Sequence, residues 1–188
     1  IQGEDYGMFI PKGSFYDNLY FDHKVSFDST LNAYVYKLHY LTEPLQNTAK
    51  LFIKLPKDSV PASKHYIALR NRRGDWNYVN TTLYNDSVLQ AKTKSLGDFT
   101  VKVDTIAPEI RPQSRTSSRI ILKIIDKQSG VNRYEGYING EWVLFEEDFY
   151  GRVSYKLDKK RLKAKRPYHL EFRVYDNCGN MSEYKLRW

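Results

Sequence analysis

Apolar and polar residues alternate along much of this chain, and a period of two is the side-chain geometry of a β-strand. In the segment 49–55 every odd position is apolar, whereas Lys50 and Lys54 occupy the other face. Segment 170–174 repeats this pattern on its even positions, and segment 120–125 is apolar on both faces apart from one lysine. Each segment is therefore predicted to bury at least one face of a sheet.

Turn signals accompany these strands. Asn139-Gly140 favours a type I′ turn and predicts a tight hairpin. Asp126 and Asp176 each begin a short segment that contains glycine, which is typical of a turn. Because no long segment has helical periodicity, the sequence predicts an all-β fold. Further short runs of aromatic and β-branched residues predict strands at 33–38, 66–71, 76–80, 99–103, 133–138, 142–146, 153–157 and 184–188.

The chain is predicted to divide near residues 104–108. Pro108 favours extended backbone in the residue before it, and a polar stretch at 111–118 follows. Short strands and turns at regular spacing are typical of sandwiches. We therefore expect two tandem immunoglobulin/fibronectin-like β-sandwich domains, with an N-terminal sandwich at 1–103 and an immunoglobulin-like one at 104–188.

Composition excludes several classes of protein. The net charge is +8, but 16 Tyr, 9 Phe and 3 Trp supply material for a core, so a folded chain is expected. A single cysteine, Cys178, excludes an internal disulfide and any multi-cysteine metal site. No apolar run approaches the roughly 20 residues that span a bilayer, so no membrane span is expected.

Four segments of the second half occur in an order that is similar to a known family. Segment 104–110 resembles the D-T-x-x-P-x-I opening of bacterial immunoglobulin-like modules, and segments 126–131, 134–146 and 174–180 follow it. Together they resemble the C-terminal β-sandwich region of envelope proteins related to lysostaphin-type zinc metallopeptidases, which cleave peptidoglycan.

This resemblance implies a non-catalytic role in an exported protein, in the periplasm or on the outer surface of a Gram-negative bacterium. The modules would position or target a neighbouring domain to the cell wall. The implied partners are a cell-wall or envelope polymer and a catalytic domain upstream of Ile1; neither nucleic acid nor a membrane is implied. The alternative is an adhesion or carbohydrate-binding module pair.

The catalytic residues of that family have no counterpart in this chain. Lysostaphin-type peptidases bind zinc through H-x-x-x-D and H-x-H, whereas His23, His39, His65 and His169 match neither spacing. His39 with Glu43 comes nearest, and a surface histidine beside a solvated glutamate is the simpler interpretation. We therefore expect no catalytic residue, no bound metal and no cofactor here, with zinc only in a catalytic domain outside this chain.

Two binding surfaces are predicted instead. Trp76 follows an exposed loop and is the candidate for a glycan contact, whereas Trp142 is expected to pack in the core. A basic run is the candidate for binding a polyanion or the cell wall through electrostatic attraction, although it is also compatible with an ordinary solvated loop. Its charged residues are Lys159, Lys160, Arg161, Lys163, Lys165 and Arg166.

Two further sets of residues are compatible with a site. Asp104, Asp126 and Asp176 stand at loop positions where carboxylates hold Ca²⁺ in some sandwich arrays, but turn formation explains these residues more simply. Cys178 would be exposed in its turn, yet no nearby His or Lys in the sequence would lower its pKa.

Overall fold

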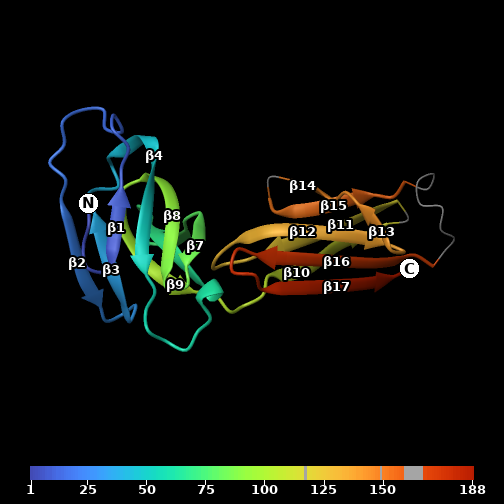
Figure 1. Cartoon of the computed structure of the whole chain (residues 1–188). Coiled ribbons are helices and arrows are strands. Elements are labelled where there is room, and N and C mark those ends of the chain that lie inside the picture. The colour runs from blue at the N-terminus through green and yellow to red at the C-terminus, as the bar shows by residue number, and fades with distance from the viewer. Residues whose placement is uncertain (117, 149, 159–166) are drawn as a thin grey trace. The chain divides into compact units, whose positions relative to one another are not determined.

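A computed structural model describes residues 1–116, 118–148, 150–158 and 167–188 (Figure 1). The structure is all-β with antiparallel sheets arranged as β-sandwiches, so the predicted fold class is confirmed. The chain forms two compact units, Ile1–Asp104 and Thr105–Trp188. Among the described residues, the one helix is a 3₁₀ turn, η1 (Ala62–Lys64), and no helix is long and apolar enough to cross a membrane.

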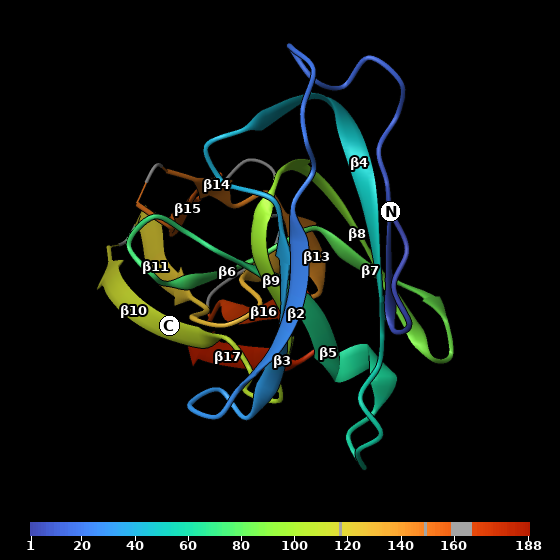
Figure 2. The same cartoon turned by 90° about the vertical axis from the view of Figure 1, so that its left-hand side faces the viewer.

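The first unit contains two sheets. One has the strand order β1-β4-β8-β7 and the other β2-β3-β9-β5-β6. Figure 2 shows the antiparallel hairpin of β2 and β3 from the side. The strands are β1 (Tyr6–Phe9), β2 (His23–Asp28), β3 (Ala33–Leu38), β4 (Pro44–Lys54), β5 (His65–Arg70), β6 (Trp76–Tyr78), β7 (Thr81–Asn85), β8 (Val88–Ser95) and β9 (Gly97–Val103).

The core of the first unit forms from the inward positions that the alternation predicts. On β4, Ala49, Leu51 and Ile53 are fully buried, and Lys50 and Lys54 are exposed. Apolar residues from β1, β3, β5, β8 and β9 complete the same cluster. Both sheets contribute to this core. One face of the β1-β4-β8-β7 sheet therefore packs against it, and the opposite face points outward.

The second unit contains two four-stranded sheets, with orders β10-β11-β15-β14 and β13-β12-β16-β17. Leu170, Phe172 and Val174 are buried as predicted, and so are the even positions of β11. The strands are β10 (Glu109–Arg115), β11 (Arg119–Ile125), β12 (Val131–Ile138), β13 (Glu141–Val143), β14 (Glu146–Glu147), β15 (Arg152–Lys156), β16 (His169–Asp176) and β17 (Met181–Arg187).

The polar stretch that follows the domain boundary forms a strand, which corrects the sequence interpretation. Strand β10 pairs with β11, and its register shifts between Pro112 and Ser114. Most of its side chains are exposed because it is an edge strand. Proline is tolerated on such a strand, where one amide can lack a ladder partner.

The connection between β4 and β5 is held by a hydrogen bond between Asp58 and His65, and this contact leads to a prediction about pH. His65 Nε2 lies 3.0 Å from Asp58 Oδ2, and the Val60 N–H donates to Asp58 Oδ1 at 2.9 Å. The hydrogen bond with His65, aided by the Val60 N–H, lowers the pKa of Asp58. Its carboxylate therefore stabilises the folded chain above the unfolded pKa of about 4, and this contribution is lost as the pH falls through the lower folded pKa.

We expect the Tm of the wild-type chain to fall more steeply than that of Asp58→Asn as the pH is lowered below about 4, the unfolded pKa. Asp86→Asn is the control, because the Asp86 carboxylate makes no hydrogen bond or ion pair with the described residues, and it should keep the wild-type slope. Parallel slopes for wild type and Asp58→Asn would contradict the linkage.

Candidate ligand-binding pocket of the first unit

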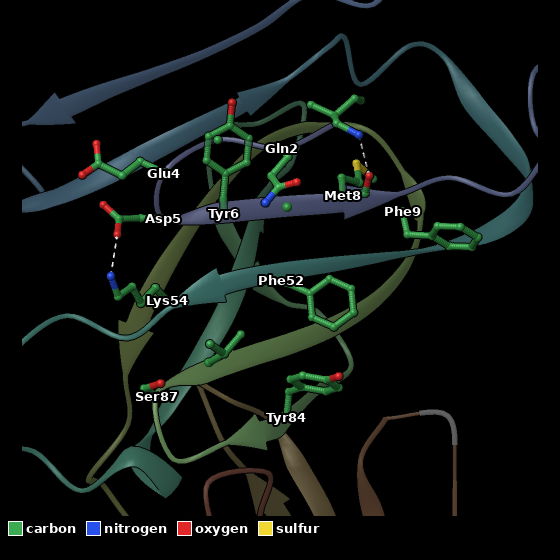
Figure 3. A pocket seen from close by; sticks show the side chains of 14 residues that line it. Gln2, Glu4, Asp5, Tyr6, Met8, Phe9, Phe52, Lys54, Tyr84 and Ser87 are labelled. Carbon is green, nitrogen blue, oxygen red and sulfur yellow. Dashed lines mark hydrogen bonds and ion pairs between the residues drawn. The ribbon is translucent and has the colours of Figure 1, made fainter.

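A pocket of about 570 Å³ lies on the outward face of the β1-β4-β8-β7 sheet (Figure 3). The turn before β1, strand β1 itself, the end of β4 and the β7–β8 hairpin form its walls. Its volume falls within the range of small-molecule sites, roughly 300–1,000 Å³. It is the candidate functional site of this unit.

Three aromatic rings from three strands line this pocket. On β1, Tyr6 and Met8 point into the core, so Phe9 points outward and stays 59% exposed. On β4, Phe52 lies between two buried residues and faces the same side. Tyr84 of β7 is 64% exposed, and its ring lies edge-on to Phe52 with centroids 5.2 Å apart. The three rings offer apolar faces to a ligand.

A β-bulge places Tyr84 here. The pairing of β7 with β8 shifts between Leu83 and Asn85, so Tyr84 is the residue without a direct partner. A bulge bends its strand and changes the direction of a side chain, and bulges are frequent beside functional sites. The ring of Tyr84 therefore turns toward Phe52.

Gly7 forms the hollow between the rings and the polar end of the pocket. It pairs directly with Phe52 in the β1–β4 register. A Cβ atom built at this position would meet only the Ile1 carbonyl oxygen, at 3.9 Å. The missing side chain thus leaves open space beside the Phe52 ring.

The other end of the pocket is charged, as Figure 3 shows. Lys54 Nζ lies 3.2 Å from Asp5 Oδ1, and both side chains are about half exposed, so this pair contributes little to stability. Below it, Tyr6 packs on Tyr36 with centroids 5.4 Å apart. Burial, and secondarily the Asp5 carboxylate, raises the pKa of Tyr36, which keeps its phenol neutral.

This arrangement is suited to binding. Apolar ring faces and a charged end suit a ligand with flat apolar faces and polar edges. No histidine or cysteine stands among the described residues that line the pocket, although Glu4 and Asp5 bring carboxylates to its rim.

Comparison with protein families matches residues 1–104 to the Zu5-like domain. The chain belongs to the Zu5-like domain family. The match ends at the last residue of the first unit, so the whole pocket lies within the Zu5-like domain. No curated protein matches the chain. The resemblance of the second unit to sandwich regions of lysostaphin-type peptidases remains a prediction.

The predicted glycan contact, Trp76, lies elsewhere in the Zu5-like domain. It is partly buried on β6, with the Arg70 guanidinium 5.8 Å from its ring centroid, and it does not line the pocket. Its role as a glycan contact stays a prediction. The basic run from Lys159 to Arg166 lies outside the described residues.

Three sequence interpretations are wrong. Trp142 is 49% exposed rather than in the core, because it pairs with Tyr137 on the outward face of β13 while Val143 points inward. Cys178 is buried rather than exposed in its turn. His39 is buried as well: its ring stacks on Phe21, and its Nδ1 accepts the Asp22 N–H at 3.2 Å.

The three aspartates considered for calcium have the roles in local structure that turns and strand ends require. Asp104 is fully buried after β9, and its N–H donates to the Lys64 carbonyl at 2.8 Å. In the second unit, Asp126 and Asp176 accept backbone N–H groups of their own turns and bring carboxylate oxygens within 4.8 Å of each other. The turn interpretation of Asp126 and Asp176 is confirmed.

The sequence contained one signal for the pocket. Phe52 stands between Lys50 and Lys54 on the face of β4 that alternation assigns to solvent. Alternation therefore places this ring outside the core, on the face where the pocket lies. Phe9 and Tyr84 gave no such signal, because strands β1 and β7 were not predicted.

Proposed function

We propose that this chain is a non-catalytic pair of β-sandwich modules from an exported envelope protein, and that the pocket of the Zu5-like domain binds a glycan strand of the cell wall. Binding there would hold a neighbouring domain against its polymer. The site of action would be the periplasm or the outer surface of a Gram-negative bacterium, as the family resemblance of the second unit implies.

The observation that supports this proposal is the aromatic hollow itself. Phe9 and Tyr84 each expose more than half of their surface, and both line the pocket together with Phe52. Exposed apolar surface gathered in one hollow is typical of a binding site. The pocket crosses four strands, or about 14 Å at the usual strand spacing, which suits an extended ligand better than a compact one.

Tyr84→Ala tests the pocket directly. Removing this ring takes away one stacking face, so we expect about tenfold weaker binding to an oligomer of N-acetylglucosamine, measured by titration calorimetry. Tyr84 lies on the surface, so the Tm should stay close to the wild-type value.

The matched control is Tyr20→Ala. Tyr20 is exposed in the same unit, but it does not line the pocket. This variant should bind with wild-type affinity. Equal affinities for both variants and the wild type would overturn the proposed site.

A further inference from the structure

Three lysines extend the outward face of the sheet beyond the pocket. Lys50 of β4 is the direct partner of Phe9 on one side and of Lys92 of β8 on the other. Lys94, two positions further along β8, faces the same way. All three side chains are exposed, so positive charge continues from the Phe9 end of the pocket.

These lysines do not stabilise the fold. Like charges directly opposite each other on paired strands are destabilising. Charged residues often protect the edges of sheets, but β4 and β8 are the two central strands of theirs. Within the described parts of the chain, no carboxylate pairs with these three lysines, whereas Lys54 on the same face is paired with Asp5.

From this position of the lysines we infer that the glycan bound by the Zu5-like domain is acidic, with a carboxylate of the sugar chain held between Lys50 and Lys92 while a sugar ring covers Phe9. This inference rests on the proposed function. An ammonium group is a compact charge with three donors, which can satisfy a carboxylate in several orientations. The cell-wall glycan offers that group wherever the stem peptide has been removed, because every second sugar, N-acetylmuramic acid, then bears a free lactyl carboxylate.

The test compares two hexasaccharides that differ in this group. One is the neutral hexamer of N-acetylglucosamine, and the other alternates N-acetylglucosamine with N-acetylmuramic acid. By calorimetry at about 50 mM NaCl, the wild-type chain should bind the acidic hexamer about fivefold more tightly, as expected for two exposed charge contacts. At about 500 mM NaCl the preference should fall below about twofold.

The double variant Lys50→Gln/Lys92→Gln should lose the preference for the acidic hexamer and keep its affinity for the neutral one. The control Lys12→Gln/Lys24→Gln removes the same charge from exposed positions of the first unit that do not lie on this sheet, and it should keep the preference.

The outcomes separate the two proposals. A preference for the acidic hexamer that is retained equally in both double variants would overturn the placement of the carboxylate between Lys50 and Lys92, and would leave the pocket to be judged by Tyr84→Ala. Loss of the preference in Lys50→Gln/Lys92→Gln, with no effect of Tyr84→Ala, would support anion binding and overturn the aromatic site.

Discussion

The Gly7→Ile variant is expected to bind the acidic hexasaccharide at least about a hundredfold more weakly than the wild-type chain. A branched side chain at position 7 would fill the hollow beside Phe52, where the backbone now leaves open space. Isoleucine fits a strand better than glycine does, so the Tm should stay the same or rise slightly. Calorimetry gives the affinity, and a thermal melt gives the stability.

A smaller substitution provides the control for this prediction. Gly7→Ala adds one methyl group and leaves most of the pocket open, so its affinity should stay within about threefold of wild type. A graded loss from alanine to isoleucine would identify the hollow as the binding site. Wild-type affinity in a folded Gly7→Ile chain would show that the glycan does not enter it.

How far the fold could be predicted depends on how each strand is buried. Strands such as β4 and β16 bury one face and expose the other, and this contrast is what alternation reports. Strand β2 is exposed along almost its whole length, and β10 is mostly polar. Edge strands of this kind are held by backbone pairing, which leaves little pattern in the side chains.

The pocket was beyond prediction for a different reason. Phe9, Phe52 and Tyr84 come from three strands that are distant in the sequence, and only the pairing register brings them together. A bulge, which no residue of the sequence predicted, then directs Tyr84 toward Phe52. The error at Trp142 concerns the assignment of faces along a strand. A shift of one residue exchanges the buried and exposed faces, and the sequence did not show which face Trp142 occupies.

Turns were more predictable because their chemistry is local. One pattern recurs: a side-chain oxygen of Asp or Asn accepts the backbone N–H groups two and four residues later. A glycine with positive φ lies three or four residues after each of these acceptors. The pattern begins at Asn71, Asp126, Asp148 and Asp176.

The Asp176→Ala variant should destabilise the second unit by about 3 kcal/mol, because this turn is the most deeply buried of the set. Asp176 Oδ1 accepts from the N–H groups of Cys178 and Asn180 at 2.9 and 2.8 Å, and Oδ2 accepts from Asn180 Nδ2 at 2.6 Å. Alanine would remove a charged acceptor from three buried donors. Urea unfolding, with hydrogen exchange followed on peptides of the second unit, measures the loss.

The Asp148→Ala variant distinguishes the effect of burial on stability from the effect of the turn conformation. Asp148 Oδ1 accepts the same two kinds of N–H group, from Tyr150 and Arg152 at 2.9 and 3.1 Å, but its turn is exposed. Water can replace the lost acceptor there, so we expect a much smaller loss of stability than in Asp176→Ala. If both variants lost the same stability, the turn conformation itself would be the source. A large loss confined to Asp176→Ala would instead show that desolvation makes this carboxylate indispensable to the second sandwich.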